Sequence, residues 1–178
     1  VTSLSASPRF MLLMMIASVL DFMVFLFNGM KYYTLREVQM IEIHAFPGGK
    51  SVQLHKCIAD GAAHAVFSGK VIVHPGAVGT DSAQSSRNLL LSGKARIDTQ
   101  PQLEIFNDDV SCKHGATVGQ IDADSLFFLR SRGFSEERAR NLLTHAFAAE
   151  IIARIPVPSL VESLGKTILE RMGGESNT

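Results

Sequence analysis

The chain has 178 residues, and its 17 basic and 17 acidic side chains leave no formal net charge. This length is enough for one domain, or one and a half, with a buried core. The balanced charge, without a basic cluster interleaved with aromatic residues, argues against binding of nucleic acid or anionic lipid. The two cysteines, Cys57 and Cys112, are too few for the disulfide framework of a secreted protein and favour a reducing compartment.

Residues 1–37 form an atypical apolar N-terminal segment. The stretch from Phe10 to Phe27 contains a single charge, Asp21. Its length reaches the lower limit of a membrane span, but an aspartate in mid-span needs a partner that a single span does not supply. We therefore expect an apolar helix packed on the rest of the chain, or a poorly ordered segment, in preference to a membrane anchor.

Residues 38–120 contain short apolar or alternating runs separated by glycine and proline turn signals. The expected strands are Gln39–Ile43, Ala65–Val73, Asn88–Leu91, Ala95–Asp98, Leu103–Phe106 and Val110–Cys112. No amphipathic helices separate them, which argues against a doubly wound sheet. The pattern alone fits a β-sandwich as well as a β-solenoid, and no exact short repeat is visible. The segment around His55 and Cys57 is compatible with a helix.

Residues 121–174 are expected to be helical, followed by a tail over residues 175–178. Apolar residues recur here at spacings of three and four, which indicates helices with one apolar face. N-cap residues, a C-terminal glycine and two prolines mark the expected helix boundaries: Asp122, Gly133, Ser135, Pro156 and Pro158. In the simplest interpretation the apolar faces only close the core.

Cys112 and His114 stand two residues apart in a segment that reads as a β-strand, NDDVSCKHGAT. Side chains at this spacing point to the same face of a strand, about 6–7 Å apart at the backbone. A thiolate and an imidazole so placed are able to share one soft metal ion. Two ligands do not close a metal site, so the others would come from elsewhere, for example another subunit. In the alternative, Cys112 is a small buried hydrophobe and His114 a surface residue.

The segment His44–Ser51, HAFPGGKS, is similar to a phosphate-binding loop but lacks an essential feature. His44 stands where the first glycine of that loop is required for the backbone to turn around the phosphates. No nucleotide-binding site is therefore predicted. The sequence also shows no Ser–His–Asp set or paired carboxylates for catalysis.

Several segments in a fixed order carry a resemblance to a known family. They are LLLS, PQLEI, DDV, C-x-H-GAT, FFLRSRG and FAAE. This order resembles the SufB/SufD family, whose members are subunits of the SufBCD iron–sulfur cluster assembly complex, and the resemblance runs from about Ile41 to about Met172. SufB is similar in outline but carries a cysteine near the position of Ser86 and lacks the C-x-H pair. The chain therefore resembles the SufD branch.

The resemblance implies a right-handed parallel β-solenoid, or β-helix, over residues 38–120 and a C-terminal helical domain over residues 121–174. It implies a non-catalytic scaffold subunit that pairs with a SufB-like subunit and binds the SufC ATPase through its C-terminal helices. The expected location is the cytoplasm, or the plastid stroma in a photosynthetic eukaryote.

The resemblance also implies no permanently bound cofactor, but a transient iron–sulfur cluster or iron. His114 is the main candidate for cluster assembly, with Cys112 a weaker one, and no catalytic residue is expected. The exposed end of the solenoid is expected to promote self-association of the short chain, which sedimentation would detect.

The main alternative is a β-solenoid hydrolase or transferase acting on a carbohydrate or acyl group, with His114 as general base. Such an enzyme needs a second catalytic group, which the sequence does not reveal. Capture of a SufC ATPase and a SufB-like chain would favour the scaffold, whereas hydrolytic turnover by the isolated protein would favour the enzyme. A third alternative is a decayed, membrane-tethered fragment with a structural role only.

Overall fold

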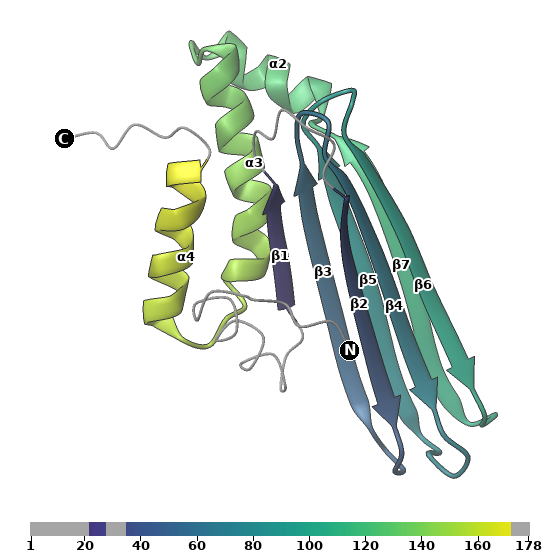
Figure 1. Cartoon of the computed structure of the whole chain (residues 1–178). Helices are drawn as coiled ribbons and strands as arrows, with labels where there is room; N and C mark the ends of the chain where they lie inside the picture. Colours follow the sequence, from purple (N-terminus) through teal and green to yellow (C-terminus); the bar gives the residue numbers. More distant parts are fainter. Residues whose placement is uncertain (1–21, 28–34, 172–178) are drawn as a thin grey trace.

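A computed structural model describes residues 22–27 and 35–171, with the strands on one side and the helices on the other (Figure 1). The strands are β1 Phe22–Phe27, β2 Leu35–His44, β3 Lys50–Ala59, β4 His64–Val73, β5 Thr80–Leu90, β6 Arg96–Ile105 and β7 Val110–Gln120. The helices are α2 Ala123–Ser131, α3 Glu136–Ile152 and α4 Pro158–Arg171. No helix among these residues is both long and apolar enough to cross a membrane.

Each strand pairs in parallel with the strand two places along the chain. The described residues therefore form two sheets, one in the order β1-β3-β5-β7 and one in the order β2-β4-β6. Consecutive strands lie in different sheets and run in opposite directions (Figure 1). Four glycines in the tight connections adopt positive φ, a backbone conformation that other residues rarely reach: Gly48, Gly61, Gly76 and Gly79.

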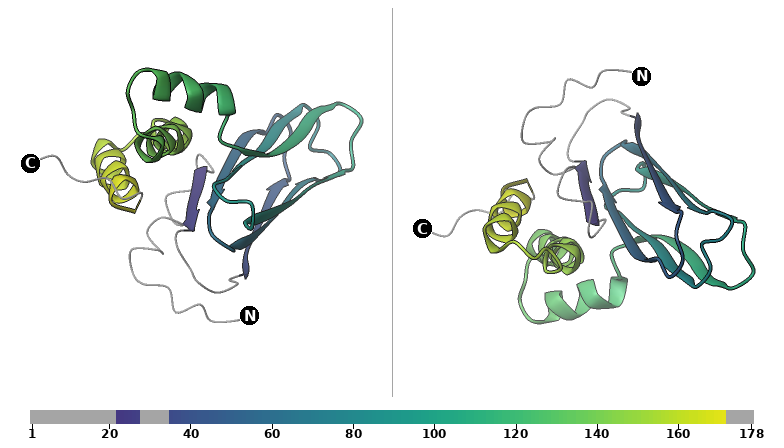
Figure 2. Two further views of the ribbon diagram at one scale, coloured as in Figure 1. Left: turned by 90° about the horizontal axis from the view of Figure 1, so that it is seen from above. Right: turned by 90° about the horizontal axis from the view of Figure 1, so that it is seen from below.

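The prediction of a right-handed parallel β-solenoid is wrong. Figure 2 shows two separate sheets that face each other, and neither forms a closed sheet in the described part of the chain. Strand length is the physical reason. The runs Ala95–Asp98 and Leu103–Phe106, expected as separate short strands, lie almost entirely in one ten-residue strand, β6. The chain thus crosses to the facing sheet at the end of each long strand, and the sandwich that the pattern also allowed is closer to the structure.

The core has one layer between the sheets and a second layer under helix α3. Strand β4 alternates between half-buried and buried positions, as expected where one face of a strand meets a core. Strand β3 is buried at every position from Gln53 to Ala59, because α3 covers its outer face. The cluster under α3 contains Leu54, Ile58, Leu89, Ala148, Ile151 and Ile152. The clusters between the sheets contain Cys57, Ala59, Ala63, Ala65, Ala95 and Ile97, and Val71, Val73 and Ala77.

The helix boundaries predicted at Asp122, Gly133, Ser135 and Pro158 are confirmed, whereas α3 ends at Ile152, four residues before Pro156. Asp122 caps α2 by accepting a hydrogen bond of 2.7 Å from the Ser125 N–H, and Ser135 caps α3 by accepting one of 3.2 Å from the Arg138 N–H. Gly133 follows α2 with a φ of 91°. These local signals were read correctly because side-chain capping needs no long-range contact. The division of the chain into domains stays a prediction.

The N-terminal expectation needs a partial correction. The expected helix over Phe10–Phe27 is not found in its last part, because Phe22–Phe27 form strand β1 and pair with Leu54–Ala59 of β3. The rest of this apolar stretch lies outside the described residues. The pairing gives β3 a neighbour on both sides over these six positions.

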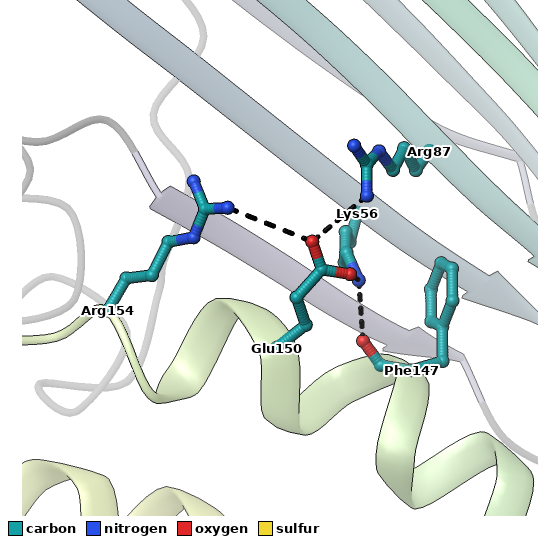
Figure 3. Close-up of polar contacts among 5 residues, drawn as sticks. All are labelled: Lys56, Arg87, Phe147, Glu150 and Arg154. Atoms are coloured by element: carbon teal, nitrogen blue, oxygen red, sulfur yellow. Dashed lines mark hydrogen bonds and ion pairs between the residues drawn. The ribbon is translucent and has the colours of Figure 1, made fainter.

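Lys56 joins the four-stranded sheet to helix α3 (Figure 3). Lys56 is 0% exposed, and its ammonium donates to the Phe147 carbonyl oxygen at 2.7 Å and to Glu150 Oε2 at 2.5 Å. The ammonium also lies 4.2 Å from the centre of the Phe147 ring. Glu150 in turn accepts from Arg87 at 2.9 Å and lies 3.8 Å from Arg154. A buried charge without such partners would be strongly destabilising, so this network fixes α3 on the sheet.

Candidate functional site

The two candidate residues lie on β7, which is an edge strand of the four-stranded sheet. Cys112 is half-buried and packs at the margin of the cluster formed by Val71, Val73 and Ala77. Alternation along the strand puts His114 on the same, inward side, but His114 is exposed because β7 is the last strand of its sheet. The structure thus places the two side chains on one side of one strand at the open edge of the sandwich.

The surroundings of Cys112 favour a protonated thiol. Burial raises the pKa of Cys112, a hydrogen bond with the Ser82 backbone opposes this rise, and the negative charges of Asp81 and Glu42 add to it. A thiolate is the form that binds a metal, so binding here would release a proton. Forming the Cys112 thiolate therefore costs free energy, and a metal would bind it readily only if a cation or a partner chain stabilised the thiolate.

Rows of polar side chains run behind the two candidates, from β3 through β5 to β7. One row is Ser51, Ser82 and Cys112, and the next is Gln53, Gln84 and His114. Ser51 donates to Ser82 at 2.9 Å, and the Gln84 amide donates to the Gln53 carbonyl oxygen. Ser82, Gln53 and Gln84 are buried, so this part of the sandwich interior is polar and hydrogen-bonded.

These rows were not predicted from the sequence, because their strands have no apolar alternation. The first half of β5 reads TDSAQSS, with polar residues on both faces, and no expected strand covered it. Serine and glutamine at every second position, Ser82, Gln84 and Ser86, are the only signal that could have revealed the inward face.

His55 and Cys57 are interior residues and not a second copy of the candidate pair. Their segment forms strand β3, so the expectation that it is compatible with a helix is wrong. The His55 ring stacks on Phe67 at 4.0 Å between ring centres, and its Nδ1 lies 3.2 Å from Ser86 Oγ. Burial lowers the pKa of His55 to about 4 and raises the pKa of Cys57 to about 12. Both groups are therefore uncharged near neutral pH.

The segment His44–Ser51 connects β2 to β3. A phosphate-binding loop leads into the N-terminus of a helix, whose free N–H groups hold the phosphates. Here the chain enters a strand at Lys50, and the His44 Nε2 atom lies 3.0 Å from Ser51 Oγ inside the sandwich. The segment therefore has a structural role in this turn.

The described residues contain no group of three or more histidine, cysteine or acidic side chains arranged to hold a metal ion. Cys112 and His114 are thus two ligands at most from this part of the chain. That the remaining ligands come from another subunit stays a prediction.

Comparison with known proteins identifies the family. A family model described as SUF system FeS cluster assembly, SufBD core domain, matches residues 26–147. The chain belongs to the SufBD core family. The match covers six of the seven described strands in full, all of α2 and most of α3. The resemblance drawn from the short segments is confirmed.

The curated relatives of this SufBD chain agree with that assignment. An iron–sulfur cluster assembly SufBD family protein of Synechocystis sp. is 55% identical over 114 residues, 64% of this chain and 25% of the relative. The iron–sulfur cluster assembly protein SufD of Escherichia coli is 43% identical over 124 residues, 70% of this chain and 29% of the relative. Protein ABCI7, chloroplastic, of Arabidopsis thaliana is 40% identical over 124 residues, 66% of this chain and 26% of the relative. The chain thus spans between 25% and 29% of the length of these proteins.

Proposed function

We propose that this chain is a non-catalytic, SufD-type scaffold in iron–sulfur cluster assembly, which pairs with a SufB-like subunit and binds the SufC ATPase. The observation that carries the proposal is the C-x-H pair on an edge strand of a SufBD core sandwich. The relatives named above support it, as does the burial of Cys57, which leaves Cys112, two residues from the exposed His114, as the more accessible of the two cysteines. The cytoplasm or the plastid stroma would be its location.

Strand β7 is the proposed contact with the SufB-like subunit. An edge strand presents a row of backbone N–H and C=O groups that can pair with another chain. A partner at this edge would lie directly beside His114 and would cover Cys112 further. It could supply the ligands that the described residues lack, with nascent cluster or iron as the shared cargo.

Replacing His114 by alanine tests this role. We expect the variant, co-expressed with SufB-like and SufC subunits, to yield complex with about tenfold less bound iron and acid-labile sulfide, because a ligand or its proton relay is lost. Cys112→Ser should show a smaller loss. His74→Ala is the matched control, since His74 is an exposed histidine on the β4–β5 turn. Normal cluster content in His114→Ala would contradict the proposal.

Helix α2 offers a surface for the SufC ATPase. None of its residues is buried, and Phe127 and Phe128 are 74% and 53% exposed. Large apolar side chains grouped on a surface commonly mark a protein contact. Leu142 of α3 is a further exposed apolar residue of the helices. We propose that the two phenylalanines form part of the ATPase-docking face.

Replacing Phe127 by aspartate should weaken SufC capture by at least about tenfold, because a buried contact would gain an unpaired charge. Titration of labelled SufC against the purified chain measures the dissociation constant. Phe46→Asp is the control, since Phe46 is 79% exposed but lies on the β2–β3 turn, at the opposite end of the strands from α2 (Figure 1). Equal weakening by both substitutions, or none by Phe127→Asp, would reject this face. Self-association of the chain through an exposed end of its β region stays a prediction.

A further inference from the structure

The side-chain carbonyl of Gln84 is a buried acceptor that finds no donor among the described residues. Gln84 is 3% exposed, and its Oε1 atom has no hydrogen-bond partner within the described part of the chain. Buried polar atoms are almost always paired in folded proteins, so an orphaned carbonyl needs an explanation. Its position beside the candidate site suggests one.

The orientation of the Gln84 amide is fixed from two directions. Its Nε2 atom donates to Gln53 Oε1 on β3. On the facing sheet, Gly69 leaves the space that the amide occupies, since a Cβ atom at that position would lie 2.8 Å from Gln84 Cδ. A planar amide whose nitrogen is turned toward β3 turns its oxygen away from β3.

His114 is the next side chain of the same row. In the parallel register Gln84 is the partner of His114, and β7 lies on the side of β5 away from β3. Neighbouring strands are about 4.8 Å apart, a separation that two inward-facing side chains bridge by hydrogen bonding. A neutral imidazole has one N–H donor and one bare nitrogen, so rotation of the exposed His114 side chain can bring an N–H to Gln84 Oε1.

We propose that Gln84 is a positioning residue for His114, whose side-chain carbonyl accepts one imidazole N–H and leaves the lone pair of the other nitrogen available at the sheet edge. This inference rests on the proposed function, in which that nitrogen meets iron, the cluster or a proton. Such partners orient a ligating imidazole, fix its tautomer and raise its basicity. The orphaned carbonyl and the exposed histidine then have one explanation.

Imidazole ¹⁵N resonances of the full chain, labelled with [¹⁵N]histidine and recorded at about pH 8, test the proposal directly. A His114→Gln variant assigns the His114 pair by its loss. We expect one protonated and one bare nitrogen with well-separated shifts in the parent protein, and collapse of the two shifts toward their mean in Gln84→Met. Gln84→Glu keeps an acceptor oxygen and should retain the separation.

Asn88→Leu is the matched control. Asn88 is 4% exposed, and its side-chain carbonyl also lacks a donor in the described part of the chain, but its register partner is Val118, which has no side-chain donor. This variant should leave the His114 resonances separated. Averaged resonances in the parent protein, or unchanged ones in Gln84→Met, would overturn the proposal.

A second measurement separates this inference from the function on which it rests. In co-expressed complex, Gln84→Met should lower cluster content about tenfold. If the resonances collapse as expected while His114→Ala retains normal cluster content, Gln84 does position His114 and the proposed role of His114 in assembly is wrong.

Discussion

Replacing Glu150 by alanine is expected to lower the free energy of unfolding by about 3 kcal/mol, because it leaves the buried Lys56 ammonium without its carboxylate. Lys56 is 0% exposed, and its contact with Glu150 Oε2 is 2.5 Å. The Phe147 carbonyl, 2.7 Å away, would remain as an acceptor but carries no charge to balance the ammonium. We place the effect at the lower end for broken buried pairs, since Glu150 itself is 39% exposed. Urea denaturation of the full chain measures it.

Replacing the other partner of the ion pair, Lys56, should lower the free energy of unfolding much less. Lys56→Met removes the buried charge and keeps a long apolar side chain under Phe147, while Glu150 retains Arg87 and solvent. We expect a loss of about 1 kcal/mol or less, because apolar replacements of buried charges are often neutral. The double variant should then be close to Lys56→Met alone. Equal large losses from Glu150→Ala and Lys56→Met would show that packing, and not the unpaired charge, dominates at this site.

The acid response of Glu150 follows from the same contacts. The hydrogen bond from Lys56 lowers the pKa of Glu150, burial opposes this, and the charges of Lys56, Arg87 and Arg154 lower it further. A carboxyl group whose pKa is lower in the folded state stabilises the fold above its ordinary pKa. This contribution is complete above the ordinary value and is lost as the pH falls through the lowered value, so the change in stability that it causes is confined to the acid range.

The helical part of the fold was predictable because its signals are local. Asp122, Gly133, Ser135 and Pro158 mark helix ends through their own hydrogen-bonding and backbone properties, and the structure places them where expected. The strand signals were also local, but they gave only the apolar parts of each strand. The pairing of β2 with β4, or of β3 with β5, depends on residues about thirty positions apart. No local pattern encodes that choice.

The candidate site also has a part that local sequence patterns predict and a part that depends on strand pairing. The spacing of Cys112 and His114 correctly predicted a shared face, because alternation along a strand is a local property. The polar rows behind them come from three strands that the register brings together, so Ser82 and Gln84 could not be assigned from sequence. His55 shows the limit most clearly, since its segment was compatible with a helix and its burial arises from Phe67 on the facing sheet.

Stability is expected to decrease by about 3 kcal/mol as the pH falls from about 6.5 to about 4, because His55 must gain a proton in the unfolded chain but resists it in the folded one. Burial lowers the pKa of His55 from 6.5 to about 4, and one pKa unit corresponds to about 1.4 kcal/mol. The neutral imidazole stacks on Phe67 and lies 3.2 Å from Ser86 Oγ. Its contribution is complete above pH 6.5 and is lost as the pH falls toward the folded-state value.

Denaturation curves of the parent chain and of His55→Phe, recorded across this pH range, isolate the effect. The phenylalanine preserves a flat ring against Phe67 but cannot be protonated, so the variant should lose most of the pH dependence even if its stability at pH 7 is lower. His74→Ala, which changes an exposed histidine, should retain the parent slope. The contacts of Glu150, above all its hydrogen bond from Lys56, hold its pKa below the ordinary value, so its protonation does not mimic the histidine response. A parent slope that survives in His55→Phe would mean that the buried imidazole is not the group that sets acid stability.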